Sequence, residues 1–234
     1  MQSKGFAVLL AAVTLLVGSP SGAEPPARPA AGPGTARTER YIAMLERKER
    51  DTFQKPDEVM RALALRPGER VADVGAGSGY FTLRLARAVG PTGLVLAIDI
   101  NPDLLAFLDR RAKEEGLANV KSLRVEKDDP KLPPGGIDTI LMVDTFHYVK
   151  ERAAYARKLR AGLAPGGRIV VIDYLPWAGC PGAPRPERRL SRETVDEAMA
   201  AAGLAPASVH EFLPEQFFVE YKTRSGSAGP VPQP

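Results

Sequence analysis

Three closely spaced glycines, Gly75, Gly77 and Gly79, follow a short apolar segment at 70–74 and precede a helical pattern at 80–89. Glycine lets the main chain turn tightly and lets a ligand approach it closely. The first turn of the following helix offers N–H groups that have no partner inside the helix. This order predicts a strand, a ligand-binding loop and a helix, which together open an α/β fold.

Apolar segments alternate with helical patterns along the rest of the chain, which predicts βαβ units around a parallel sheet. Two helices, at 38–52 and 57–65, come before the glycine loop. The last two apolar segments are close in sequence, so the second should run antiparallel beside the first. We expect a doubly wound, Rossmann-like sheet of seven mostly parallel strands with an antiparallel C-terminal hairpin. The predicted strands are 70–74, 94–98, 122–126, 139–143, 168–172, 207–212 and 217–222, and the intervening helices are 80–89, 102–115, 150–163 and 192–202.

Two neighbours of the glycine loop indicate which ligand it holds. A dinucleotide loop of the form G-x-G-x-x-G would need glycine at position 80, where this chain has Tyr80, so NAD is disfavoured. Asp73 lies two residues before the first glycine, where a diphosphate-binding loop would carry an apolar residue. A carboxylate there suits a cationic amino acid group instead.

With these residues in place, the chain resembles the class I S-adenosylmethionine (SAM)-dependent methyltransferases from about residue 57 to 222. Within that family it resembles the small-molecule branch that looks like the ubiquinone/menaquinone methyltransferases. Five motifs match in order: the loop 71–79, Asp99 after the second strand, Asp128 after the third, Asp144 after the fourth, and residues 163–168 before the fifth.

The resemblance implies a place for each part of SAM. The glycine loop would face the methionine part, Asp99 would receive the two ribose hydroxyls, and Asp128 would meet the adenine amino group, with Asp129 as its rival. Ile100 would cover the adenine face or else serve the core. The complete set of implied cofactor contacts is Asp73, Gly75, Ala76, Gly77, Gly79, Tyr80, Asp99, Ile100, Asp128, Asp129 and Asp144.

The segment after the fourth strand holds the candidate catalytic residues. His147 could take a proton from a hydroxyl acceptor, assisted by Asp144 or Tyr148. The alternative is that His147 only caps or packs the following helix. A base is needed for a hydroxyl, and hardly for a neutral amine or a thiolate.

Several observations bear on the acceptor and on metals. The segment 144–147 lacks the Asn/Asp-Pro-Pro-Tyr/Phe pattern of enzymes that methylate amide or adenine nitrogens, and the formal charge of +4 is too mild to imply nucleic acid. We therefore expect a small-molecule acceptor, whose identity and oligomeric context stay open. Acceptor lids are predicted at 38–55 and 174–190, where the arginines are either an anion site or a solvated loop. One Cys and two His favour no metal.

The ends of the chain differ in composition from its middle. Residues 1–23 read as a signal peptide, with Lys4, an apolar run at 6–17 and small residues at 21–23. We expect a Pro/Ala/Gly-rich linker at 24–37, the methyltransferase domain at 38–222 and a disordered tail at 223–234. The protein would be periplasmic or secreted, or else anchored to the inner membrane. The competing functions are a SAM-binding module without turnover and a nicotinamide-dependent oxidoreductase.

Overall fold

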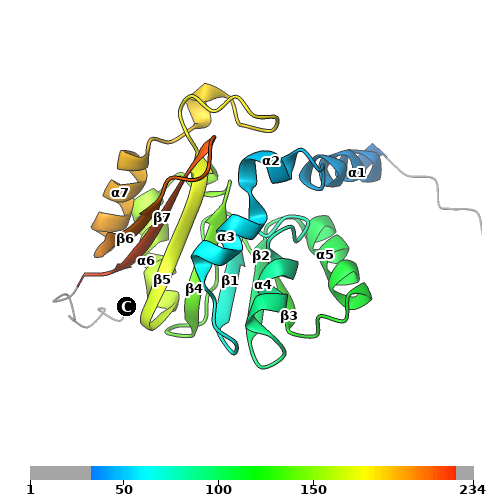
Figure 1. Cartoon of the computed structure of the whole chain (residues 1–234), viewed down its shortest axis with the longest axis horizontal. Helices are drawn as coiled ribbons and strands as arrows, with labels where there is room; N and C mark the ends of the chain where they lie inside the picture. Colours follow the sequence, from blue (N-terminus) through cyan, green and yellow to red (C-terminus); the bar gives the residue numbers. More distant parts are fainter. Residues whose placement is uncertain (1–32, 225–234) are drawn as a thin grey trace, which may run out of the picture.

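The computed structural model describes residues 33–224. The predicted signal peptide 1–23 lies outside the described residues, as does nearly all of the predicted tail. Three helices lead into the sheet and four others follow its strands (Figure 1). The helices are α1 Pro33–Leu45, α2 Arg50–Gln54, α3 Pro56–Leu63, α4 Thr82–Val89, α5 Pro102–Glu114, α6 Arg152–Gly162 and α7 Arg192–Ala201, with short 3-10 turns η1 Phe146–Tyr148 and η2 Pro186–Arg188.

Seven strands form one sheet in the order β3-β2-β1-β4-β5-β7-β6. The first five strands in the chain run parallel, and β7 is antiparallel to both β5 and β6. The predicted fold class is therefore confirmed, including the terminal hairpin. The strands are β1 Arg70–Val74, β2 Leu94–Asp99, β3 Val120–Arg124, β4 Ile137–Val143, β5 Leu163–Tyr174, β6 Leu204–His210 and β7 Gln216–Thr223.

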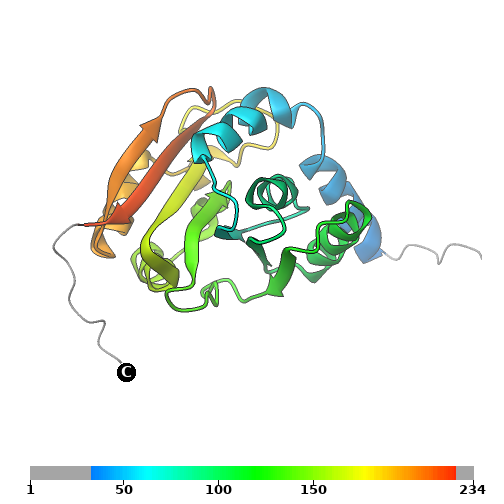
Figure 2. The same ribbon diagram turned by 60° about the horizontal axis from the view of Figure 1, so that its bottom comes forward.

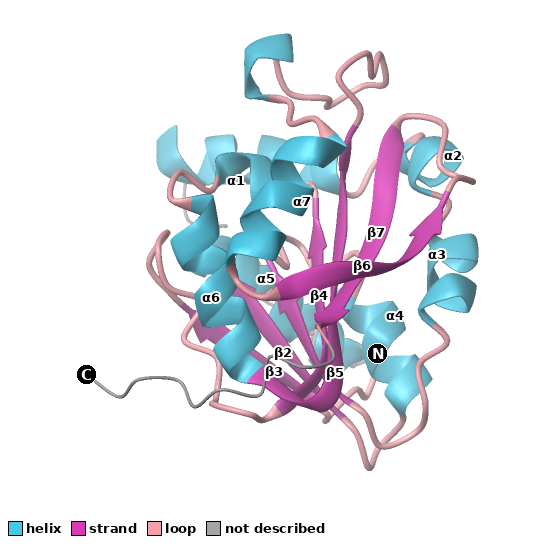
Figure 3. Ribbon diagram, turned by 90° about the vertical axis from the view of Figure 1, so that its left-hand side faces the viewer, coloured by secondary structure: helices cyan, strands magenta, loops and turns pink. Residues whose placement is uncertain are grey.

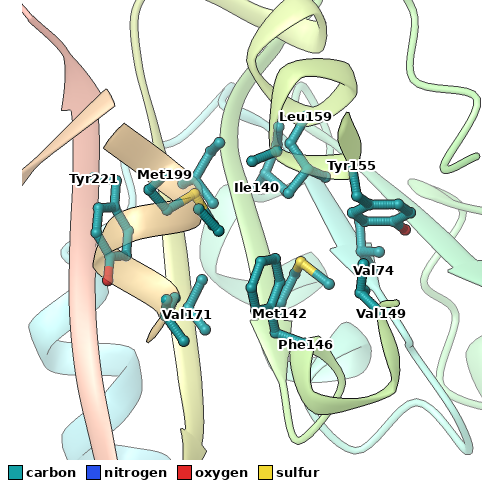
Figure 4. Close-up of a cluster of buried hydrophobic side chains, with 14 of the residues drawn as sticks. Val74, Ile140, Met142, Phe146, Val149, Tyr155, Leu159, Val171, Met199 and Tyr221 are labelled. Atoms are coloured by element: carbon teal, nitrogen blue, oxygen red, sulfur yellow. The ribbon is translucent and has the colours of Figure 1, made fainter. Parts of the chain in front are cut away.

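Helices cover both faces of the sheet because its central strands are apolar on both sides. Figure 3 shows α6 and α7 on one side of the strands and α3 and α4 on the other. In Figure 4, Met199 from α7 and Leu159 from α6 point toward Ile140 and Val171 of the central strands. Burying side chains of this size contributes about 1.5–3 kcal/mol each. The central strands, and so their carboxyl ends, are held firmly.

The predicted helix at 38–52 is wrong in one respect, because it is two helices. The chain leaves the helical path after Leu45, and the guanidinium of Arg50 donates to the Leu45 carbonyl at 3.0 Å. This bond supplies a partner that the end of a helix otherwise lacks. α1 also begins at Pro33, inside the segment predicted as a linker, and it lies beside α5 (Figure 2).

Only β1 has its predicted bounds, and among the other strands the differences in β3, β5 and β6 are the largest. β3 begins and ends two residues earlier, since Val120 pairs with Val95. β5 is longer at both ends and starts at Leu163. β6 begins at Leu204 and tolerates Pro206 because it is an edge strand with a register shift after that proline. Among residues 33–224, no helix is both long and apolar enough to cross a membrane.

Candidate functional site

A cavity of about 650 Å³ lies over the carboxyl ends of β1, β2 and β4. This is the edge where ligands bind in open α/β sheets. The cavity wall has two parts. The glycine-loop half is formed by Val74, Gly75, Ala76, Gly77, Ser78, Ile98, Asp99, Ile100, Asn101 and residues 125–128. The opposite half is formed by Tyr41, Met44, Leu45, Arg47, Arg50, Phe53, Asp144, Thr145, His147, Tyr148, Tyr174, Gly182 and Arg188.

The glycine loop is shaped by hydrogen bonds to the next strand. Both Gly75 and Ala76 donate their N–H groups to the carbonyl of Ile98, at 2.8 and 3.0 Å. Gly75 has φ +85°, and a methyl group there would lie 2.1 Å from Oγ1 of Thr145. Glycine is therefore required at this position for its backbone conformation and for space. The loop is consequently fixed against both β2 and the turn after β4.

Asp99 closes the bottom of the glycine-loop half. One carboxylate oxygen accepts from the Gly77 N–H at 2.8 Å, and the other accepts from the Asn101 N–H at 2.9 Å. Two main-chain donors thus fix the direction of the carboxylate, and each oxygen keeps lone-pair capacity for a ligand. Ile100 beside it is 45% exposed and lines the cavity, which excludes the alternative of a core role.

The structure separates the rivals after β3. Asp128 is exposed and lines the cavity. Asp129 does not line the cavity. Its carboxylate accepts from the Lys131 N–H at 2.9 Å and lies 4.0 Å from the Lys158 amine. Of the two, only Asp128 is available to a ligand in the cavity.

Three residues predicted to touch the cofactor do not line the cavity. Asp73 is buried and accepts from the Thr82 hydroxyl at 2.6 Å, and burial raises its pKa to about 6. Gly79 leaves room for Leu108 of α5, since a methyl group there would lie 2.8 Å from that side chain. Tyr80 donates to Asp51 and lies under the Arg50 guanidinium, 3.9 Å from the ring centroid. All three hold the loop and the N-terminal segment in place.

Asp144 joins the N-terminal segment to the sheet. It has φ +53°, an unusual conformation for a residue other than glycine. Its carboxylate accepts from the amide of Gln54 on α2 at 2.6 Å and from the amide of Gln216 on β7. Burial raises its pKa to about 7, against the lowering effect of Arg50. Sequence reasoning missed both glutamines.

His147 is buried, and its ring is oriented by a residue that sequence reasoning also missed. Its Nδ1 lies 2.7 Å from one carboxylate oxygen of Asp173, and its main-chain N–H donates to the other oxygen at 3.0 Å. Of the two predicted assistants, Asp144 makes no hydrogen bond to the ring, and Tyr148 packs against it with 4.1 Å between the ring centroids. The available signal was an acidic residue at the carboxyl end of β5, beside β4.

Both segments predicted as acceptor lids contribute residues to the cavity wall. Arg47, between α1 and α2, donates to the Pro181 carbonyl in the loop after β5, and the two segments therefore meet. Of the three arginines predicted there, Arg188 lines the cavity. Arg189 instead donates to the carbonyls of Pro184 and Pro176, and Arg185 is outside the wall. Among residues 33–224, no three His, Cys, Asp or Glu side chains are placed to hold a metal ion.

The sheet order and a cavity over the glycine loop define a doubly wound α/β protein built like the SAM-dependent methyltransferases. A methyltransferase domain model matches residues 72–169. The ubiquinone/menaquinone biosynthesis C-methyltransferase UbiE of Ectopseudomonas mendocina (strain ymp) is 32% identical over 111 residues, 47% of this chain and 43% of that protein. The chain thus spans less than half of that relative.

Solved structures extend the likeness over most of the described chain. A SAM-dependent methyltransferase from Aquifex aeolicus is 28% identical, with a TM-score of 0.72 over 78% of this chain and 96% of that one. Geranyl diphosphate C-methyltransferase from Streptomyces coelicolor A3(2), at 18% identity, shares the fold with a TM-score of 0.62 over 76% of this chain and 80% of that one. The chain is thus similar in sequence and in fold to the class I SAM-dependent methyltransferases, and these similarities support SAM as its cofactor.

Proposed function

We propose that the protein transfers the methyl group of SAM to a small-molecule acceptor. The observation that carries this proposal is Asp99, whose carboxylate is fixed by Gly77 and Asn101 at the end of β2 and faces the cavity. An acceptor-only group with two oxygens suits the two ribose hydroxyls of SAM. SAM, when bound, supplies a methyl group already activated by the sulfonium.

The rest of the glycine-loop half fits the remaining parts of the cofactor. The main chain of Gly75, Ala76 and Gly77 lines the wall where the amino acid part would lie. Asp128 would accept from the adenine amino group, and the exposed side chain of Ile100 would cover the adenine ring. The volume of about 650 Å³ leaves room for a second molecule beside the cofactor.

The opposite half would receive the acceptor. In methyl transfer the protein mainly aligns the acceptor with the activated carbon and excludes water. The α1–α2 segment and the loop after β5 meet through Arg47 and Pro181, which supports an enclosed site suited to a small molecule rather than to nucleic acid. His147, Asp144 and Tyr148 are among the polar residues at this wall.

The experiment is mass analysis of nucleosides that purify with the protein, followed by an assay of methyl transfer from labelled SAM. Bound SAM or its demethylated product together with turnover is the expected result. Bound SAM without turnover under any acceptor mixture would favour the binding module. A bound nicotinamide nucleotide would replace the proposal with an oxidoreductase.

We also propose that the chain acts outside the cytoplasm or at the inner membrane, because of Lys4 and the apolar run at 6–17. A mature chain would then begin at Glu24. N-terminal sequencing of protein from the native host, with fractionation, decides this point. A full-length chain in the membrane fraction would mean anchoring, and a full-length chain in the soluble cytoplasm would contradict both versions.

A further inference from the structure

The imidazole of His147, a residue of the cavity wall, has one buried nitrogen without a hydrogen-bond partner among residues 33–224. Its side chain is 2% exposed, and Nε2 has no hydrogen-bond partner among residues 33–224. The residue lines the opposite half of the wall, where we propose that the acceptor lies. A buried polar atom without a partner is costly and calls for a functional explanation. A ligand group in the cavity that bonds to Nε2 would supply one.

Asp173 decides which kind of group that is. Its carboxylate accepts three hydrogen bonds, from Nδ1 and the main-chain N–H of His147 and from the Tyr174 N–H at 2.8 Å. A carboxylate that accepts from Nδ1 requires the proton on that nitrogen. In the neutral ring Nε2 is then a proton acceptor. The missing partner is therefore a hydrogen-bond donor.

Unlike Nε2 of His147, the carboxylate of the neighbouring Asp144 already has hydrogen-bond partners. Both carboxylate oxygens of Asp144 already accept from the side-chain amides of Gln54 and Gln216. The other titratable groups near the ring are the phenols of Tyr148 on η1 and Tyr174 on β5, with Arg50 of α2 acting on Asp144 and Tyr174. His147 is thus the group at this wall that is arranged to receive a proton.

We propose, resting on the methyltransferase function above, that the acceptor reacts through a hydroxyl oxygen and that Asp173 is the positioning residue for this step. The oxygen forms a bond to the methyl carbon while the carbon–sulfur bond breaks and its electron pair stays on sulfur. The hydroxyl proton passes to Nε2 of His147, and the resulting imidazolium is stabilised by Asp173. The proton then leaves to water, and the neutral ring is restored.

The chemistry of other acceptors does not use this arrangement. A neutral amine attacks with its lone pair and a thiolate has already lost its proton, so neither needs a base as the methyl arrives. A hydroxyl is a weak nucleophile until its proton is removed. An ether product follows from the proposal, in contrast to the carbon methylation stated in the name of the UbiE relative.

The first test is acceptor chemistry. The full chain purified from its native host is incubated with SAM carrying a ¹³C-labelled methyl group and with a small-molecule extract of that host, and products are read by carbon NMR. A new methyl signal on oxygen is expected. A signal on nitrogen, sulfur or carbon would overturn the proposal while leaving the methyltransferase function intact. No labelled product at all would contradict the proposed function itself.

The second test is specific to the dyad. His147→Gln should lower kcat for that product about 10²-fold or more, and Asp173→Asn about 10-fold or more, with SAM affinity within about twofold of the parent. His210→Gln, at the other histidine, paired with Glu220 at 3.1 Å on the β6–β7 hairpin, is the matched control and should change neither. If His147 is the base, kcat of the unsubstituted protein should rise with pH as the imidazole loses its proton, and this rise should be absent from His147→Gln.

A readout without turnover guards against variants that fail to fold. Nitrogen NMR of labelled imidazoles in the unsubstituted protein should show the His147 proton on Nδ1 and an unprotonated Nε2 at neutral pH. A proton on Nε2 alone would overturn the proposal, because that nitrogen could not then receive another. An unchanged kcat in a folded His147→Gln variant would do the same.

Discussion

The two halves of the cavity are built in different ways. The glycine-loop half comes from short segments that follow β1, β2 and β3, and main-chain hydrogen bonds such as Gly77 to Asp99 shape it. The opposite half is assembled by side chains from distant parts of the chain. The amides of Gln54 and Gln216, for example, both donate to the Asp144 carboxylate. The half proposed for the cofactor thus depends on local backbone geometry, whereas the half proposed for the acceptor depends on contacts between distant parts of the chain.

The largest expected effect is a loss of stability caused by a substitution in the glycine-loop half. Gly75→Ala should lower the free energy of unfolding by about 2–5 kcal/mol, because its methyl group meets Thr145 at 2.1 Å and φ +85° disfavours a side chain. Gly166→Ala is the matched control, with φ +77° and open space around it, and should cost only about 1–2 kcal/mol. Denaturant titration measures both. Equal losses would mean that the loop tolerates a side chain against Thr145.

This contrast explains what the sequence could predict. The glycine loop, Asp99 and Asp128 follow from short motifs, because parallel strands bring their carboxyl ends to one edge. The same motif assigned Asp73 and Gly79 to the ligand, whereas they bond to Thr82 and leave room for Leu108. A contiguous motif does not distinguish a residue that touches a ligand from one that supports the loop.

The acceptor half could not be predicted to the same degree. His147 and Asp173 come from the neighbouring strands β4 and β5, and the pairing between them depends on the strand order. Gln54 precedes the whole sheet in sequence and reaches Asp144 only because α2 folds back over the cavity. Such contacts leave no periodic pattern in the sequence, so the pairing of His147 with Asp173 was missed.

A second prediction uses pH to compare Asp73, which supports the glycine loop, with Asp144, which lies in the opposite half of the cavity wall. Burial raises the pKa of Asp73 to about 6 and that of Asp144 to about 7, above the value of about 3.9 for an unfolded chain. The folded state therefore binds more protons than the unfolded state, and stability falls as pH rises from about 4 to 6 or 7. Between pH 6 and 7 the loss belongs mainly to Asp144 and is at most about 1 kcal/mol.

Urea titrations at pH 5, 6 and 7 of Asp73→Asn and Asp144→Asn measure this difference. Relative to the unsubstituted protein, Asp144→Asn should gain stability up to pH 7, and Asp73→Asn should stop gaining near pH 6. If both variants show the same pH dependence as the unsubstituted protein, neither acid is perturbed as described.

The smallest expected effect is on SAM affinity and distinguishes the neighbouring acids Asp128 and Asp129, which follow β3. Asp128→Ala should weaken SAM binding by about 0.5–1.5 kcal/mol through loss of one hydrogen bond. Asp129→Ala should leave SAM affinity unchanged, because its carboxylate bonds to Lys131 outside the cavity wall. Calorimetric titration of both variants gives the comparison. The reverse order of effects would place the adenine ring beside the Asp129 turn.

Calorimetric titration of SAM into the unsubstituted protein and into Asp99→Ala tests the central claim most directly. The unsubstituted protein should bind one SAM per chain, and the variant should bind about 1–3 kcal/mol more weakly because a charge-assisted hydrogen bond at a partly buried site is lost. Its circular dichroism should match that of the parent. Equal affinities in two folded proteins would contradict the assignment of Asp99, and with it the placement of the cofactor over the glycine loop.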